Sequence, residues 1–236
     1  MKQTWHDLLF AHWPIPPEHL RPLVPPELPL DTFDGKCWVG VVPFRMSGIR
    51  ARWTPPIPGL SSLPELNVRT YVIHKGKPGV YFFSLDAASH AAVWGARTFY
   101  HLPYFYAQMK STDKGGVIHY NSTRKDKRMP RFSSTLPPPE DLNAQFRGTY
   151  RPIGSVREKS TLEHFLTERY CLYTLHQAKL YCCDIHHQPW PLQNAEALIE
   201  QNTVAAAAGV DLPNAAPLLH FVKRLEVLIW PLRRAD

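Results

Sequence analysis

The stretch ELNVRTYVIHKGKPGVYFFSLDA, residues 65–87, carries the strongest structural signal in this chain of 236 residues. Two runs rich in β-branched and aromatic residues flank the turn-forming sequence HKGKPG, and this pattern predicts a β-hairpin. Successive side chains of a strand point to opposite faces. In the first predicted strand one face is apolar, formed by Leu66, Val68, Thr70 and Val72, and the other carries Glu65, Asn67, Arg69 and Tyr71.

The polar face of this strand suggests a functional site. A guanidinium such as that of Arg69 can clamp a carboxylate, Glu65 can move a proton, and Asn67 can orient either group. Tyr71 continues the same face. The alternative is a solvent-facing strand in which Glu65 and Arg69 pair with each other, and the residues alone leave both interpretations open.

Further strands are expected on either side of the hairpin. Proline is unusually frequent, with 24 residues, and this spacing suits short strands and rigid connections better than long helices. Short apolar runs between turn signals predict strands, at KCWVGVVPF (36–44), within 117–160, at LYCCDIHHQPWPL (180–192) and at LLHFVKRLEVLIWPL (218–232).

A few short helices complete the prediction. Ser160 and Glu163 have the spacing of a capping box, and the other helices are expected at 16–24, around 87–94 where Gly95 and Pro103 keep the helix short, and at 195–210. The expected fold is therefore α+β and strand-dominated, in a single domain over residues 1–236.

Composition limits the classes of protein that fit. Hydrophobic residues make up 44% and charged residues 20% of the chain, close to ordinary globular values, so a sizeable core is expected. The N-terminal stretch has no long apolar run, and so resembles neither a signal peptide nor a membrane span. A cytoplasmic location without a membrane partner is the default expectation. Four cysteines without a secretory signal indicate reduced thiols.

The formal net charge of +7 raises the question of an acidic partner. Part of this charge lies in RKDKRMPR, residues 124–131. The run has no interleaved aromatic residues and no nucleic-acid-binding motif around it. A solvated loop is therefore favoured, and a nucleic-acid-binding protein is the weaker alternative.

Metal and cofactor motifs are weak. In CCDIHH, residues 182–187, Cys182, Asp184 and His186 would share one face of a strand, but zinc ligands usually come in separated pairs. The sequence contains no GxGxxG, GxxxxGK[ST] or GxSxG motif. No metal and no cofactor are predicted.

Several segments together resemble a known family. These are PELNVRTYV (64–72), KPGVYFFSLDA (77–87), Ala96-Arg97, HLPY (101–104), FLTERYCLY (165–173) and HQPWPLQNAE (187–196). As a set they are similar to the YqjF-like family of uncharacterised bacterial proteins, which is distantly related to the acetoacetate decarboxylase-like superfamily. The resemblance spans almost the whole chain. It implies a cone-shaped, mainly antiparallel β-barrel with short peripheral helices, a central apolar pocket, and the option of a homo-oligomer.

The resemblance fails at the reactive amine. The decarboxylases of that superfamily carry an arginine, a proline six residues later and then two lysines, the first of which forms a Schiff base after its pKa is lowered. Here Arg97 and Pro103 keep the interval, but Tyr104 and Phe105 follow. A phenol cannot form an iminium with a ketone. Lys110 lies farther along, and nothing in the sequence places it in the pocket. Gly40 falls roughly where those enzymes carry a catalytic glutamate.

Seven residues remain as site candidates under this resemblance. The catalytic candidates are Glu65, Tyr104 and His101, and the substrate-binding candidates are Arg69, Arg97, Asn67 and Tyr71. Structural alternatives exist for three of them: His101 could donate to a backbone carbonyl, Arg97 could brace Glu65 or Asp86, and Tyr104 could belong to the core.

Two functions follow and stay open. The first is binding of a small carboxylated or carbonyl-bearing organic molecule in a central cavity, without Schiff-base chemistry. The second is a lysine-independent lyase, dehydratase or isomerase that uses Glu65 as a base and Arg69 or Tyr104 to stabilise an oxyanion.

Overall fold

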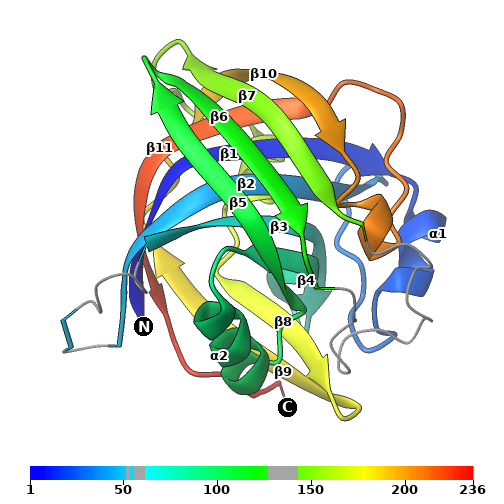
Figure 1. The fold of residues 1–236 in the computed structure, drawn as a ribbon. Coiled ribbons are helices and arrows are strands. Elements are labelled where there is room, and N and C mark those ends of the chain that lie inside the picture. The colour runs from blue at the N-terminus through cyan, green and yellow to red at the C-terminus, as the bar shows by residue number, and fades with distance from the viewer. Residues whose placement is uncertain (52–53, 56–61, 127–142, 236) are drawn as a thin grey trace.

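The predicted hairpin is confirmed in the computed structural model, which describes residues 1–51, 54–55, 62–126 and 143–235 (Figure 1). Strands β3 (Ser62–His74) and β4 (Lys77–Ala87) pair antiparallel along their length. The turn is Lys75-Gly76, with φ of 48° and 75°. Two positive φ values in a two-residue loop match the twist of the flanking strands, which is why a glycine stands there.

The described residues form a 12-stranded sheet. The remaining strands are β1 (Lys2–Ile15), β2 (Cys37–Arg50), β5 (Tyr104–Lys114), β6 (Val117–Arg124), β7 (Gln145–Ile153), β8 (Cys171–His176), β9 (Lys179–His187), β10 (Gln193–Asn202), β11 (Leu218–Ile229) and β12 (Arg233–Arg234). The helices are α1 (Pro17–Leu20), α2 (His90–Tyr100) and α3 (Thr161–Thr167), with 3-10 turns η1 (Arg21–Leu23) and η2 (Ala206–Ala208). The strand-dominated fold class is confirmed.

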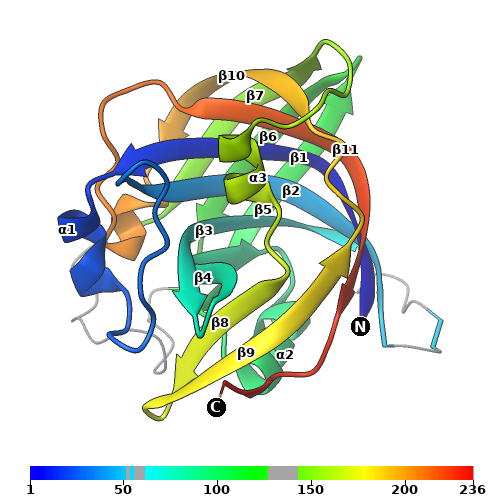
Figure 2. The same cartoon turned by 180° about the vertical axis from the view of Figure 1, so that it is seen from behind.

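The sheet closes on itself twice. Its order is β12-β9-β8-β4-β3-β2-β1-β11-β10-β7-β6-β5, and two additional pairings join β9 to β11 and β4 to β5. The first closure makes a seven-strand ring of β9, β8, β4, β3, β2, β1 and β11. The second makes a nine-strand ring of β4, β3, β2, β1, β11, β10, β7, β6 and β5. The two rings share β1, β2, β3, β4 and β11. Figure 1 and Figure 2 show three of these shared strands, β1, β2 and β3, crossing the middle of the molecule.

Because β3 belongs to both rings, it is buried on both faces. Leu66, Val68 and Val72 pack in the core that includes β6 and β7, inside the nine-strand ring. The opposite face points into the seven-strand ring, where Tyr71 packs. Glu65, Asn67 and Arg69 on that face are only 4%, 5% and 7% exposed. The alternative of a solvent-facing strand is therefore wrong.

Helix α2 is longer than the sequence predicted. It begins after Ser89, whose side chain accepts from the Ala92 amide, and runs through Gly95 to Tyr100. A glycine in a helix interior costs only about 1 kcal/mol, and packing of Val93 against the core of the seven-strand ring offsets such a cost. The helix ends where His101 takes a left-handed conformation with φ of 52°.

The helix predicted over 195–210 is wrong in its first half. Residues of that segment form β10, which pairs with β7 from Asn194↔Ile153 to Asn202↔Phe146. A Cβ at Gly148 of β7 would lie 2.7 Å from the Leu198 carbonyl oxygen, so the two strands approach closely because position 148 has no side chain. This pairing overrides the helix propensity of alanine and glutamate. Only η2 and its closing Gly209 follow the prediction.

The other predicted helices are present. Ser160 and Glu163 form the predicted capping box at the start of α3, with backbone and side chain bonded in both directions. No helix in the described part of the chain has the length and apolar character needed to cross a membrane.

Candidate functional site

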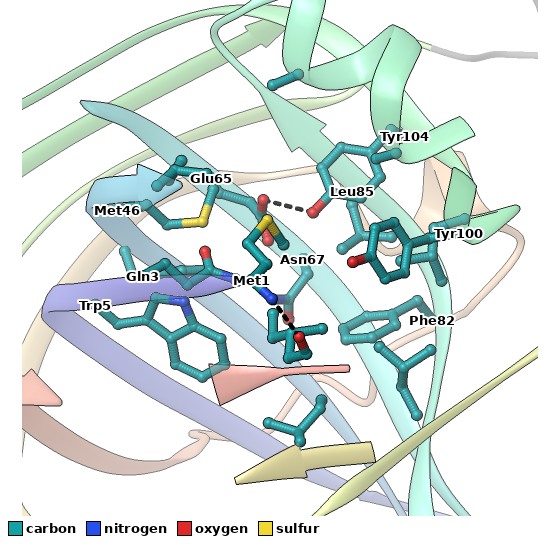
Figure 3. Close-up of a pocket in the computed structure, with 18 of the residues that line it drawn as sticks. Met1, Gln3, Trp5, Met46, Glu65, Asn67, Phe82, Leu85, Tyr100 and Tyr104 are labelled. Carbon is teal, nitrogen blue, oxygen red and sulfur yellow. Dashed lines mark hydrogen bonds between the residues drawn. The ribbon is translucent and has the colours of Figure 1, made fainter. Parts of the chain in front are cut away.

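A cavity of about 300 Å³ lies inside the seven-strand ring. Every strand of that ring contributes to its wall, and α2 covers one side (Figure 3). The lining is mostly apolar, from residues such as Trp5, Leu8, Val42, Phe44, Met46, Phe82, Leu85, Leu172, Ile185 and Ile229. The polar groups are few and converge from β1, β3, α2 and β5: Gln3, Glu65, Asn67, Arg69, Tyr100 and Tyr104. Apolar walls with a few placed polar groups are typical of ligand sites.

Glu65 and Tyr104 form the clearest pair in this cavity. The Tyr104 hydroxyl donates to Oε2 of Glu65 at 2.7 Å, as Figure 3 shows. Burial raises the pKa of Glu65 to about 7, and the charge of Asp86 adds to this increase. Hydrogen bonds from Tyr104 and Asn67 act in the opposite direction and lower the pKa. Burial and the adjacent carboxylate also raise the pKa of Tyr104 well above its usual value. The pair therefore consists of a phenol donor and a carboxyl group that changes protonation near neutral pH.

Tyr104 enters the cavity because of the segment before it. The first residues of β5 pair in parallel with the end of β4, Leu85 opposite Tyr104. Tyr104 directly follows Pro103 and so occupies the position at which the decarboxylase pattern has its reactive lysine. Lys110 does not replace that lysine, because it is exposed farther along β5, opposite Asn121. Among the described residues no lysine lines this cavity.

Arg69 is a buried cation whose hydrogen bonds are incomplete. Its Nη2 reaches the Tyr71 hydroxyl at 3.5 Å and the Leu166 carbonyl oxygen at 3.4 Å, both long contacts to neutral acceptors. Its Nε has no partner. The guanidinium lies 5.1 Å from the centre of the Phe10 ring. In the described ranges no carboxylate pairs with it, and a buried charge without a counter-charge is costly.

Asn67 and Tyr71 flank this arginine on the same face of β3. Asn67 lines the cavity, and its Oδ1 has no hydrogen-bond partner. Tyr71 lies behind the cavity wall and contacts His12, with the Tyr71 hydroxyl 2.6 Å from the His12 Nε2. Burial and the charge of Arg69 lower the pKa of His12 well below its usual value. A neutral His12 leaves Arg69 as the cation at this end of the cavity.

No sequence motif singles out His12, and Gly40 stands out only at the position where the decarboxylases carry a glutamate. His12 pairs with Gly40, and Gly40 pairs with Arg69, across three adjacent strands. A Cβ at position 40 would lie 3.1 Å from the His12 ring and 3.6 Å from Cγ of Arg69. The glycine thus leaves room for two large side chains. The alternation of Leu8, Phe10 and His12 was the available signal for a buried histidine.

Arg97 and His101 are not brought to the cavity. Arg97 donates to the Tyr104 carbonyl oxygen at 2.7 Å and to Oδ2 of Asp126 at 2.8 Å, so it braces α2 against β5 through an acid other than the two expected. His101 ends α2, and its ring stacks on His176 with centroids 3.8 Å apart. Neither side chain belongs to the cavity lining.

A buried charge pair lies near the site. Arg124 donates to Asp86 at 2.8 Å, with both side chains almost fully buried, and its guanidinium lies 3.8 Å from the Phe105 ring centre. Burial raises the pKa of Asp86 to about 6. The basic run at 124–131 therefore begins inside the protein, and its residues 127–131 lie outside the described residues.

The CCDIHH stretch has other partners. Asp184 pairs with Lys77 and with Arg233, and Cys182 and Cys183 are buried. Within the described residues no three His, Cys, Asp or Glu side chains are grouped so as to hold a metal ion.

Comparisons with known proteins agree with this architecture. Residues 2–226 match the model of the DUF2071 family, described as an uncharacterized conserved protein. The chain is 53% identical over 236 residues to the uncharacterized protein YqjF of Bacillus subtilis (strain 168), covering 99% of this chain and 92% of that protein.

Solved structures with low sequence identity share the fold. The enduracididine biosynthesis enzyme MppR complexed with pyruvate matches with a TM-score of 0.63 at 9% identity, over 100% of this chain and 90% of the other. An acetoacetate decarboxylase-like enzyme from Sphingomonas wittichii RW1 matches with a TM-score of 0.62 at 12% identity, over 100% and 92%. The acetoacetate decarboxylase of Legionella pneumophila matches with a TM-score of 0.60 at 13% identity, over 99% and 88%. The expected acetoacetate decarboxylase-like fold is confirmed.

Proposed function

The chain belongs to the DUF2071 family, and from that premise we propose that its cavity binds a small carboxylated or carbonyl-bearing organic molecule without a Schiff base. One observation carries the proposal. Arg69 is a guanidinium 7% exposed at the wall of an apolar cavity, with an unpartnered Nε. A carboxylate at this position supplies the missing counter-charge and accepts the fork of N–H donors. One of the structures with the same fold holds pyruvate.

Binding of simple acids tests this proposal. Trp5 lines the cavity, so its fluorescence reports on occupancy during titration with pyruvate, acetoacetate or butanoate. We expect Arg69→Gln to weaken binding at least about tenfold, because a charge-assisted bond is worth roughly 1.5–3 kcal/mol. The control is Arg224→Gln, since Arg224 is an exposed arginine on β11. Equal loss in both variants would contradict a specific role for Arg69.

The absence of a Schiff base has its own test. Treatment with borohydride in the presence of acetoacetate or pyruvate traps an iminium as a stable adduct on the amine. We expect no adduct on any lysine by intact-protein mass spectrometry. A lysine adduct would overturn this part of the proposal and leave the binding part to the titration.

Acid–base catalysis is a second candidate function, favoured by the Glu65–Tyr104 pair. A ligand carbonyl oxygen that replaces Glu65 as the acceptor of the Tyr104 hydroxyl frees the Glu65 carboxylate and brings its own α-carbon beside it. Glu65 then takes the α-proton, the C–H electron pair forms the enolate double bond, and the carbonyl electrons move to the oxygen held by Tyr104. Return of the proton to carbon or loss of a β-leaving group completes an isomerisation or an elimination.

Hydrogen–deuterium exchange tests this second function. The α-protons of a ketone or oxo acid such as 4-oxopentanoate, followed by NMR in D₂O, should exchange faster with protein present. The rate should rise as the pH passes through about 7, where Glu65 ionises. Glu65→Gln should lose at least about 100-fold of this acceleration, the usual scale of general-base catalysis. An unchanged rate in that variant would remove Glu65 as the base.

A further inference from the structure

The cavity has a polar end at Arg69 and a mostly apolar mouth. Strand register places Arg69 beside Gly40 and His12 at one end of the shared wall. Toward the other end of the same strands Met46 pairs with Trp5, and Met1 and Ile49 also line the cavity there. Between the two ends lie Asn67 and Glu65, on the same face of β3 as Arg69. The polar row therefore runs along the length of the cavity rather than across it.

The distance along this row matters for the ligand. Glu65 and Arg69 are four residues apart on one strand, so their Cα atoms are about 13 Å apart. A molecule that places its carboxylate at Arg69 and also passes the Glu65–Tyr104 pair is elongated. Beyond that pair the walls are mostly apolar. The polar groups there are the Gln3 amide, the Tyr100 hydroxyl and the Met1 amine, which already donates to the Ile229 carbonyl oxygen, so a long polar extension of the ligand finds few partners.

The mouth continues into a second apolar depression on the surface. This outer groove is lined by Met1, Ala51, Phe99, Tyr100, Ile229, Trp230 and Pro231. Four of its residues, Met1, Phe99, Tyr100 and Ile229, also line the cavity. Phe99 is 62% exposed, and beside it on α2 Trp94 is 63% exposed, with the two rings 5.8 Å apart. Exposed aromatic side chains at a cavity mouth suit an apolar chain that leaves it.

We propose that the ligand is an amphiphilic carboxylic acid, with its carboxylate at Arg69 and its unbranched or aromatic tail running along β3, under α2 and out past Phe99. This inference rests on the proposed function, and it adds the class of ligand. The tail occupies the apolar length of the cavity, and a longer tail continues into the outer groove.

A series of straight-chain carboxylates tests the inference. Acetate, butanoate, hexanoate, octanoate and decanoate are titrated by calorimetry, each below its micelle concentration. Affinity should rise about fourfold for each added methylene, the increment for burying one CH₂ group. Octanol is the matched ligand without charge. It should bind at least about tenfold more weakly than octanoate, and Arg69→Met should erase that difference.

Gly95 offers a way to shorten the cavity. It lines the cavity in the middle of α2, and a Cβ added there meets no atom within 4 Å. Gly95→Phe should fill the mouth, lowering the affinity for decanoate at least about tenfold and sparing butanoate. The control is Ala91→Phe on the exposed side of the same helix, which should change neither. Circular dichroism confirms that both variants fold.

The outcomes separate the two proposals. Binding of short acids that depends on Arg69 but does not improve with chain length overturns the inference and keeps the proposed function. Failure of every acid to bind overturns both. Equal binding of octanol and octanoate agrees with an apolar tail in the cavity but overturns the assignment of the carboxylate to Arg69. This outcome therefore overturns the inference as stated.

Discussion

The two rings that share β3 differ in whether a cavity lies beside their unpaired polar atoms. The nine-strand ring also leaves buried atoms without a partner, Ser122 Oγ and both Nη atoms of Arg124, but neither residue lines the cavity. In the nine-strand ring, the Tyr120 hydroxyl donates to the carbonyl oxygens of Glu65 and Phe44, and the Tyr150 hydroxyl donates to that of Asp7. In the seven-strand ring, Arg69 Nε and Asn67 Oδ1 have no partner beside a cavity of about 300 Å³. Native proteins rarely leave buried polar atoms unpaired without a reason. The difference supports the proposal that a ligand occupies the seven-strand ring, whereas the nine-strand ring is filled by its own side chains.

The largest effect on stability is expected for a matched pair of leucines, one facing each ring. Leu66 points into the filled core and Leu85 lines the cavity, and both are almost fully buried. We expect Leu66→Ala to lower the free energy of unfolding by about 3–5 kcal/mol and Leu85→Ala by about 2, because a side chain that already borders a cavity loses fewer contacts. Urea denaturation measures both. Equal losses would mean that the two interiors are packed alike.

The pH dependence of stability should reveal the buried Glu65. Its pKa rises from 4.5 to about 7 on folding, so between those pH values the folded chain holds a proton that the unfolded chain releases. The resulting stabilisation is present below pH 4.5 and lost as the pH rises through about 7, by up to roughly 3 kcal/mol. Glu65→Gln should flatten this part of the profile. Identical slopes in the two proteins would rule out a raised pKa.

Removal of the Tyr104 hydroxyl should raise the pKa of Glu65 further. Tyr104 donates to Glu65, and this bond favours the ionised carboxylate. In Tyr104→Phe we therefore expect the pKa of Glu65 to rise by about one to two units, the equivalent of one hydrogen bond to a charged group. Carbon NMR of the labelled carboxyl follows the titration. Tyr150→Phe, which removes a hydroxyl that donates to the Asp7 carbonyl oxygen, serves as the control and should leave the pKa of Glu65 unchanged.

The smallest effect is expected at Arg97, because its guanidinium has a carboxylate partner and, within the described residues, that of Arg69 does not. Arg97 is paired with Asp126, with both side chains about one-third exposed. Arg97→Gln should cost at most about 1 kcal/mol of stability and should leave the affinity for butanoate unchanged. Loss of binding comparable to that in Arg69→Gln would mean that the cavity is not the binding site.

The local parts of this fold could be predicted from the sequence. Alternation and the Lys75-Gly76 turn define the hairpin, and the Ser160–Glu163 spacing defines the start of α3. The two closures could not be predicted, because the pairing of β9 with β11 and of β4 with β5 depends on residues distant in the chain. The same limitation explains the error at 195–210, where contact with Gly148 of β7 decides between strand and helix.

The site, like the fold, could be predicted only where it depends on one local segment. The face of β3 follows from alternation on one strand, and three of its candidates line the cavity. Arg97 keeps its interval to Pro103, but its partner Asp126 lies in the basic run, and no local pattern joins them. His12 was missed because its neighbours Gly40 and Arg69 come from two other strands.

A crystal structure with hexanoate bound tests the central claim most directly. We expect both carboxylate oxygens within about 3 Å of the Arg69 guanidinium nitrogens, with the alkyl chain of hexanoate pointing toward Phe99. A carboxylate bound at Arg97 or on the outer surface, with the space beside Arg69 still unfilled, would contradict it.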